Sequence, residues 1–173
     1  KVLLTFLFAL VAIVTAQGQS YCISGGPSSA ADSELTGVQL NGDTDTISNI
    51  YDPLDTIACG ATKVQFFLGD TADISVGASY TVSVTMGTCG GSYSGAIAAW
   101  IDFNADGDFD DAGELLGSYA GAPTTTQDFT FVVPGSAALS ADSGATRMRV
   151  MQQESASTTT IAPCNSFTWG AVE

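Results

Sequence analysis

Oxygen-bearing side chains occupy alternate positions in one short acidic stretch, which runs from Trp100 to Glu114 with the sequence WIDFNADGDFDDAGE. A glycine, Gly107, stands at its turn. Alternate carboxylate and amide oxygens on a tight loop can converge on one point, which is the arrangement that a hard cation such as Ca2+ requires. The sequence therefore predicts a Ca2+ site whose ligands are Asp102, Asn104, Asp106, Asp108, Asp110 and Glu114.

The charge of this stretch supports the same interpretation. Asp111 adds a further carboxylate to those of the predicted ligands. Two like charges ~4 Å apart repel each other by about 1 kcal/mol even in water. The whole chain has 4 Lys and Arg residues against 18 Asp and Glu residues, so its own cations cannot neutralise the loop. A bound cation would hold the loop together, and the alternative is a solvated acidic hairpin.

The stretch resembles an EF-hand loop only in part. Its first half fits the D-x-[DN]-x-[DN]-G pattern, but Glu114 falls one residue after the position of the closing glutamate. The flanking segments do not look helical, because residues 95–103 have the character of a buried strand and residues 114–119 are too few for a helix. We therefore expect an EF-hand-like loop between two strands.

Alternation of apolar and polar residues is the main periodic signal, and it is clearest at Tyr80–Met86. The other predicted strands are Leu35–Leu40, Val64–Leu68, Gly95–Phe103, Asp128–Val133, Thr146–Met151 and Phe167–Val172. Residues 23–33 are predicted to be irregular. Turns rich in Gly, Ser, Asp and Pro separate these segments, and no segment has the spacing of an amphipathic helix. The prediction is an all-β, antiparallel β-sandwich, jelly-roll or immunoglobulin-like, with about seven to eight strands.

Residues 1–16 have the pattern of a secretory signal peptide: a basic first residue, an apolar run and a small-residue cleavage site ending at Ala16. A short membrane anchor is the alternative. Residues 17–173 are then predicted to form a single domain, without substantial helix and without membrane insertion after cleavage. The expected location is secreted, extracellular or at the cell surface.

Four cysteines follow the predicted leader: Cys22, Cys59, Cys89 and Cys164. An even number of cysteines in a secreted chain indicates disulfides, and four of them allow three pairings. We favour Cys22–Cys164, which would tie together the two ends of the domain, and Cys59–Cys89, which would join neighbouring strands.

Composition excludes several classes of function. A formal net charge of −14 argues against nucleic acids and anionic membranes as partners. The absence of His excludes Ser-His-Asp and Cys-His catalysis and His-bound metals. Two carboxylates could in principle hydrolyse glycosides, but a loop that stabilises ionised carboxylates is unsuited to supplying a general acid. The chain is therefore predicted not to be an enzyme.

The aromatic and arginine residues have two interpretations each. Trp100 lies in an apolar segment and is expected in the core, whereas Trp169 and Tyr119 are candidates for stacking on a sugar. Arg147 and Arg149 share one face of their predicted strand. They either anchor nearby carboxylates or form an exposed strand face.

Several motifs, in this order, resemble the GEVED domain family. They are Tyr21-Cys22, the acidic stretch Trp100–Glu114, Val133-Pro134 leading to Thr146-Arg-Met-Arg-Val150, Pro163-Cys164 and Gly170-Ala-Val-Glu173. The resemblance implies a disulfide-bearing β-sandwich of secreted and cell-surface proteins, often attached to adhesion modules or extracellular hydrolases. It also implies that the acidic stretch binds Ca2+.

The chain departs from the family pattern at its end. The motif that names the family would read Gly-Glu-Val-Glu-Asp, and Ala171 stands in place of its first Glu. The sequence stops at Glu173, before the Asp and the last strand that the family leads one to expect. On this resemblance the domain is expected to be truncated at its C-terminal edge and to be part of a longer, multidomain chain.

The function expected from these observations is that of a non-catalytic, extracellular Ca2+-binding module in adhesion, or an accessory domain of a larger secreted or surface protein. Its partner would be an extracellular glycan or a surface protein. The alternative is a carbohydrate-binding module attached to a secreted hydrolase, and a carboxylate-based glycoside hydrolase is the third hypothesis.

Overall fold

The structure is a computed structural model, and it describes residues 21–22, 25–51, 63–88, 91–135 and 144–173. The described residues form nine strands and one short 3-10 helix, η1 (Thr158–Thr160). The strands are β1 (Gly26–Ser29), β2 (Ser33–Asn41), β3 (Thr46–Ile50), β4 (Ser79–Thr88), β5 (Gly95–Ile101), β6 (Leu115–Gly121), β7 (Thr126–Val132), β8 (Met148–Glu154) and β9 (Ser166–Val172).

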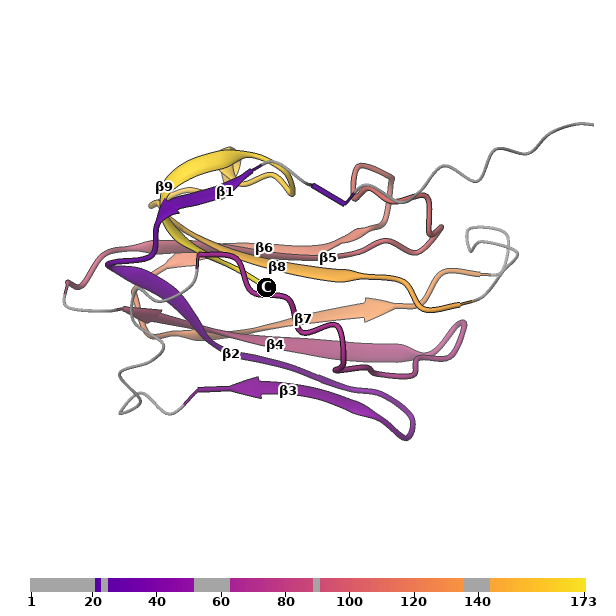
Figure 1. The fold of residues 1–173 in the computed structure, drawn as a ribbon. Coiled ribbons are helices and arrows are strands. Elements are labelled where there is room, and N and C mark those ends of the chain that lie inside the picture. Colours follow the sequence, from indigo (N-terminus) through magenta and orange to yellow (C-terminus); the bar gives the residue numbers. More distant parts are fainter. Residues whose placement is uncertain (1–20, 23–24, 52–62, 89–90, 136–143) are drawn as a thin grey trace, which may run out of the picture.

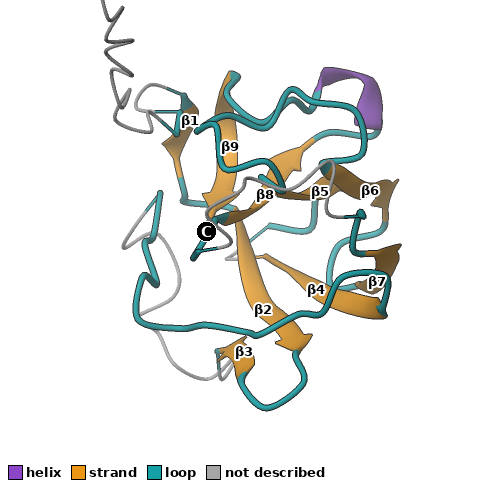
Figure 2. Ribbon diagram, turned by 90° about the vertical axis from the view of Figure 1, so that its right-hand side faces the viewer, coloured by secondary structure: helices purple, strands orange, loops and turns teal. Residues whose placement is uncertain are grey.

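The strands form two sheets that pack face to face (Figure 1). One has five strands in the order β1-β9-β8-β5-β6, and the other has four in the order β3-β2-β4-β7. Neighbouring strands are antiparallel except β1 and β9, which run parallel. Figure 2 shows the same two layers from the side, with η1 next to the five-stranded sheet. The predicted all-β sandwich is confirmed.

The main core lies between the sheets and follows the predicted alternation. On β4, Val82, Val84 and Met86 are buried in this core. Their neighbours Thr81 and Thr85 point to the other side, where their hydroxyls hydrogen-bond to threonines of β7 at 2.9 Å. The four-stranded sheet therefore has one apolar and one hydroxyl-rich face, as its period of two predicts.

The centre of the five-stranded sheet is buried on both faces. Every residue of β5 is buried. Ile97 and Ala99 belong to the core between the sheets, whereas Ala98 and Trp100 belong to a second apolar cluster on the outer face. This outer cluster is completed by Phe109, Met151 and Val172, with Tyr21, Cys22, Val64, Ile161 and Phe167 packed against it. Trp100 is thus a core residue, as predicted.

Two predictions about individual segments are wrong. Val64–Leu68 is not a strand: Val64 forms only an isolated bridge to Val172, and Phe66 and Leu68 are exposed. Residues 23–33 contain β1, which was predicted to be irregular because it is short and rich in Gly and Ser. Its pairing with β9 across the fold, rather than local propensity, makes it a strand.

The predicted Cys22–Cys164 disulfide is present, and it links residues 142 positions apart. It joins the segment before β1 to the segment before β9. The proposed Cys59–Cys89 pair and the predicted signal peptide, residues 1–16, lie outside the described residues. Among the helices of the described residues, none has the length and apolar character needed to cross a bilayer.

Glu173 directly follows β9 and contacts a strand of each sheet, β8 and β3. The backbone of Glu173 exchanges two hydrogen bonds with Val150, at 2.8 and 2.9 Å. Its side chain accepts a hydrogen bond from the Asn49 amide at 3.4 Å. Burial raises the pKa of the Glu173 carboxyl to about 7; the Asn49 hydrogen bond opposes this shift and the charge of Asp70 adds to it.

We expect the disulfide to contribute strongly to stability. Replacing Cys22 and Cys164 together with serine should lower the free energy of unfolding by about 2–5 kcal/mol, because the bond closes a long loop in the unfolded chain. Urea denaturation of the two proteins measures this difference. A loss below about 1 kcal/mol would show that the bond does not restrain the unfolded state.

Glu173 should make stability fall as the pH rises. Its pKa is higher in the folded state, so the unfolded state loses its proton first, and the penalty grows from about pH 4.5 to above pH 7. Glu173→Gln should therefore be more stable than the parent by about 1–3 kcal/mol at pH 8 and nearly equal to it at pH 4. Denaturation at both values tests this, and a pH-independent difference would contradict it.

Candidate metal centre

The acidic stretch is the loop between β5 and β6, and two aromatic side chains fix it to the sheet. Phe103 packs in the core between the sheets, and Phe109 packs in the cluster on the outer face. The Phe109 ring also lies 5.4 Å from the Tyr21 ring. The loop is therefore anchored on both sides of the five-stranded sheet, which leaves little freedom to the residues between the anchors.

Buried carboxylates at the two ends of the loop hold its backbone. Asp102 is 0% exposed, and its Oδ2 accepts the Gly107 N–H at 3.0 Å. Glu114 is 2% exposed, and its two oxygens accept the N–H groups of Phe103 and Asp111, each at 3.2 Å. Each side chain thus satisfies backbone donors that the loop conformation would otherwise leave unpaired.

The base of the loop is joined to the segment that precedes β8. The Asp102 N–H donates to the carbonyl of Arg147 at 3.1 Å, and the Thr146 hydroxyl donates to the carbonyl of Asp102. On the other side, the Ile101 N–H donates to the carbonyl of Glu114 at 3.0 Å. These contacts continue the sheet's hydrogen bonding past the end of β5.

The tip of the loop is a series of turns in which a side chain accepts the N–H two residues later. Asn104 accepts from Asp106 at 3.1 Å, Asp106 from Asp108 at 3.2 Å, and Asp108 from Asp110 at 2.9 Å. Asn and Asp favour this geometry because their short side chains reach the second following amide. The turns require left-handed backbone at Ala105, with φ of 57°, and at Gly107, with φ of 98°.

These turns bring three exposed carboxylates together. Asp106, Asp108 and Asp111 each offer an oxygen, and the three oxygens lie within 4.8 Å of one another. The Asn104 amide donates to Asp106 at 3.1 Å and also to Asp111. Ligand oxygens lie 2.3–2.6 Å from Ca2+, so oxygens around one ion are separated by at most about 5 Å. The spacing of the three carboxylates fits one such ion.

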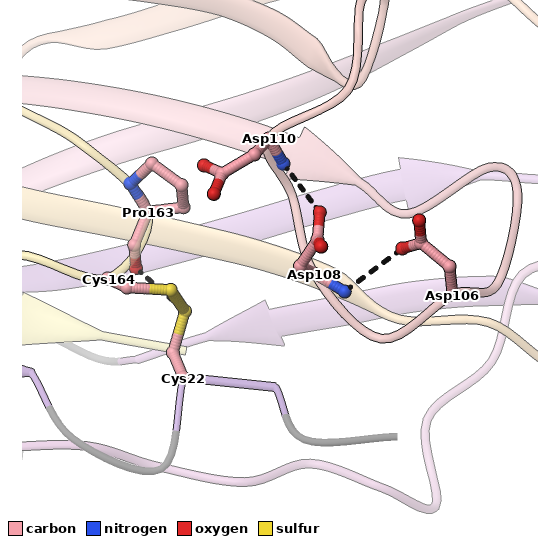
Figure 3. Close-up of a disulfide and its surroundings, with 6 residues drawn as sticks. All are labelled: Cys22, Asp106, Asp108, Asp110, Pro163 and Cys164. Atoms are coloured by element: carbon pink, nitrogen blue, oxygen red, sulfur yellow. Dashed lines mark hydrogen bonds between the residues drawn. A yellow bond between two sulfur atoms is a disulfide. The ribbon is translucent and has the colours of Figure 1, made fainter. Parts of the chain in front are cut away.

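The predicted ligands do not all lie together in the structure. Asp106 and Asp108 belong to the exposed trio, and Asn104 contacts it, whereas Asp102 and Glu114 lie buried at the base. Asp110 is not in the trio, and Figure 3 shows its carboxylate pointing away from that of Asp106. Asp111 takes its place. The alternation of oxygen-bearing residues does not predict Asp111 as a ligand, because Asp111 directly follows Asp110 and so breaks the alternation.

The buried carboxylates at the base of the loop destabilise the fold unless a positive charge or hydrogen bonds offset their loss of hydration. Burial raises the pKa of Glu114; the hydrogen bond from the Asp111 N–H opposes this, and the charges of Asp102, Asp111 and Asp106 add to it. Within the described residues, Asp102 Oδ1 is buried without a hydrogen-bond partner. The Tyr21 hydroxyl is buried nearby, and burial, followed by the Asp102 carboxylate, raises its pKa to about 12. No hydrogen bond joins the Tyr21 hydroxyl to Asp102, since the hydroxyl oxygen and Asp102 Oδ1 are both without a hydrogen-bond partner.

These residues fit a hard divalent cation. All donors are oxygens, as Ca2+ prefers over Zn2+, and their negative charges repel one another in the absence of a cation. The buried, unpartnered oxygen of Asp102 is a second sign that the loop lacks a positive partner of its own. Asp106, Asp108 and Asp111 would hold the ion, with Asn104 beside them.

The two predicted sugar-contacting aromatics do not form a joint platform. Trp169, on β9, is 43% exposed, whereas Tyr119, on β6, packs against the core between the sheets. Strands β8 and β5 lie between them, which places them about 14 Å apart at the normal strand spacing. One sugar ring cannot contact both.

The arginines follow neither of their two predicted roles completely. Arg149 does not belong to an exposed strand face, because only 7% of its surface is exposed. Burial lowers the pKa of its guanidinium. Arg147 lies with its guanidinium carbon 4.6 Å from the centre of the Tyr21 ring. Both side chains line one hollow next to the loop.

Comparison with known proteins gives one family. The family model of the GEVED domain matches residues 96–173. The acidic stretch, the arginine motif and the Cys164 region lie inside this match, and Tyr21-Cys22 lies before it. Neither the curated proteins nor the solved structures contain a match to this chain.

The left-handed turn at Gly107 should be essential to the loop. With a chelator present, Gly107→Ala should lower the free energy of unfolding by about 1–2 kcal/mol, because a Cβ is disfavoured at this φ. Gly135→Ala is the matched control, since no atom lies within 4 Å of the added Cβ and its φ is ordinary. Equal stabilities of the two variants in chemical denaturation would contradict the prediction.

Proposed function

Residues 96–173 belong to the GEVED domain family, and we propose that this chain is a non-catalytic, Ca2+-binding β-sandwich module of an extracellular or cell-surface protein, acting in adhesion or as an accessory domain of a larger chain. The observation that supports this most directly is the convergence of Asp106, Asp108 and Asp111 on a loop whose base already holds two buried carboxylates.

Calcium would act on this loop by changing its electrostatics. Three exposed carboxylates whose oxygens lie within 4.8 Å repel one another, and a divalent ion between them turns this repulsion into attraction. Phe103 and Phe109 anchor the loop in the two apolar clusters. Stabilising the loop with Ca2+ would therefore also stabilise the packing of both clusters. A structural role for the ion follows, in which it stabilises the folded domain.

An extracellular setting agrees with the covalent and ionic features. The Cys22–Cys164 disulfide is of the kind that persists in oxidising compartments, and the leader pattern at residues 1–16 supports secretion. Extracellular Ca2+-binding modules commonly have dissociation constants of about 10⁻⁴–10⁻³ M, which an exposed, partly formed site can reach.

The geometry gives little support to the alternative functions. A glycosidase needs one carboxyl with a raised pKa opposite a second carboxyl across a cleft. The three clustered aspartates are instead all exposed and close together. A carbohydrate-binding platform built from Trp169 and Tyr119 is opposed by the two strands that separate them.

Calcium should raise the thermal midpoint of the domain. At a concentration about 100-fold above the dissociation constant, one site stabilises by about 2.7 kcal/mol, which corresponds to about 5–10 °C in a domain of this size. Asp108→Asn and Asp111→Asn should each remove most of this shift. The measurement is calorimetric melting with Ca2+ and with chelator.

Asp110→Asn is the matched control for this experiment. It makes the same change of charge in the same loop, but its carboxylate lies outside the trio, so the Ca2+-dependent shift should remain. An unchanged midpoint of the parent protein at about 10–100 mM Ca2+, which is about 100-fold above the expected dissociation constant, would contradict the proposal. Loss of the shift in Asp110→Asn alone would assign the site to a different set of carboxylates.

A further inference from the structure

We propose that a hollow next to the acidic loop binds the carboxylate group of a small monoanionic ligand with a ring-sized body. This hollow, called here the arginine hollow, is lined by Tyr21, Cys22, Gly25, Val64, Phe66, Arg147 and Arg149, and its volume is about 380 Å³. Small-ligand sites have volumes of ~300–1,000 Å³, so the arginine hollow has room for one ring and its substituents.

Arg149 supplies the strongest sign that a ligand is needed. Its side chain is 7% exposed, and within the described residues its Nε is buried without a hydrogen-bond partner. Burial lowers the pKa of the guanidinium, but arginine remains charged in proteins. A buried cation with an unsatisfied donor is unfavourable unless an anion meets it, and the arginine hollow is where an anion can reach it.

Arg147 is held in place without using its hydrogen-bonding edge. Its guanidinium carbon lies 4.6 Å from the centre of the Tyr21 ring, within the range of a cation–π contact. A guanidinium on an aromatic ring keeps its in-plane N–H groups available to an acceptor. Arg149 lies on β8 and Arg147 directly precedes this strand, and both line the arginine hollow, while Val150 packs into the core.

The distribution of charge makes this hollow unusual in the molecule. The chain has 4 Lys and Arg residues, and three of them, Lys63, Arg147 and Arg149, are in its described part. The two arginines line the arginine hollow, and Lys63 directly precedes Val64, which also lines it. In a protein with a net charge of −14, these residues create the one place in the described residues where basic side chains gather.

The surroundings favour a carboxylate over a more highly charged anion. The protein's net negative charge repels phosphate and sulfate dianions more strongly than a monoanion. A carboxylate also matches the planar fork of arginine, which can bind it through two parallel hydrogen bonds. A single-charged, planar group is therefore the best match to the two arginines.

The walls of the arginine hollow indicate a ligand with a body as well as a charge. Tyr21 and Val64 present apolar surface, and Phe66 is 69% exposed at the rim. Such a large exposed aromatic side chain at the edge of a hollow can cover one face of a bound ring. Aromatic acids and acidic sugars both offer a carboxylate on a ring, so the experiment has to distinguish these two sources.

The test is an NMR titration of the full chain, labelled with ¹⁵N, in the presence of Ca2+ and again with chelator. The probes are phenylacetate as an aromatic acid, glucuronate as an acidic sugar, phenylacetamide as the uncharged match of the first, and inorganic phosphate. We expect saturable shifts of the Arg147, Arg149 and Val64 amides with one or both carboxylates. We expect none with the amide, and weaker binding of phosphate.

Variants connect the binding to the arginine hollow. Arg147→Gln should weaken the better carboxylate about tenfold, as expected for hydrogen bonds to a charged group. Phe66→Ala should weaken it less, and Val132→Ala, which removes a side chain 61% exposed on β7, should leave it unchanged. Arg149→Gln is a further variant. If this substitution of a buried residue prevents folding, the affinity of Arg147→Gln alone tests the proposal.

Each result supports or overturns the proposal. Binding of phenylacetate alone identifies an aromatic acid, and binding of glucuronate alone identifies an acidic sugar. No saturable shift with either carboxylate at 50-fold excess over about 1 mM protein, equal binding of the amide, tighter binding of phosphate, or unchanged affinity in Arg147→Gln would overturn it. The chelator arm keeps the result separate from the Ca2+ site, because none of the clustered aspartates lines the arginine hollow.

Discussion

The burial of the central strands β5 and β8 on both faces is the constraint on which the rest of this structure depends. The four-stranded sheet covers only the inner face of β5 and β8, so the outer face, with Trp100 and Met151, must be covered by other parts of the chain. The chain before β1, the β5–β6 loop and the segments around Val64 and Ile161 do this. Coverage by separate loops, rather than by a third sheet, leaves gaps between them, and the arginine hollow is one such gap.

The same need for coverage explains how an acidic loop can be well ordered. Phe103 and Phe109 enter opposite apolar clusters, and burying each large aromatic ring stabilises the loop by about 2–3 kcal/mol. This gain offsets part of the cost of the carboxylates between the two rings. The chain's first described residues add to the same support, because the Tyr21 ring packs against Phe109. The Cys22–Cys164 bond fixes the neighbouring residue (Figure 3).

The parts of the fold that could be predicted are those in which local pattern and burial agree. Tyr80–Met86 alternates because one face of β4 is buried, and the apolar run of β5 reflects burial on both faces. Val64–Leu68 has the apolar residues of a strand, but only Val64 packs against the outer cluster and forms an isolated bridge, and β1 depends on a distant partner. In the site, spacing located the loop but not the role of Asp111, which joins the trio through turn geometry, nor the burial of Arg149.

The most informative fact about the charges is that the arginines and the acidic loop are neighbours that do not neutralise each other. The loop meets the segment before β8 through backbone and hydroxyl groups, since Asp102 donates to the carbonyl of Arg147 and accepts from Thr146. The guanidinium of Arg147 lies over Tyr21 instead, and Nε of Arg149 finds no partner among the described residues. The two proposed ligands would balance these charges separately: a cation at the clustered carboxylates, and an anion at the arginines of the hollow.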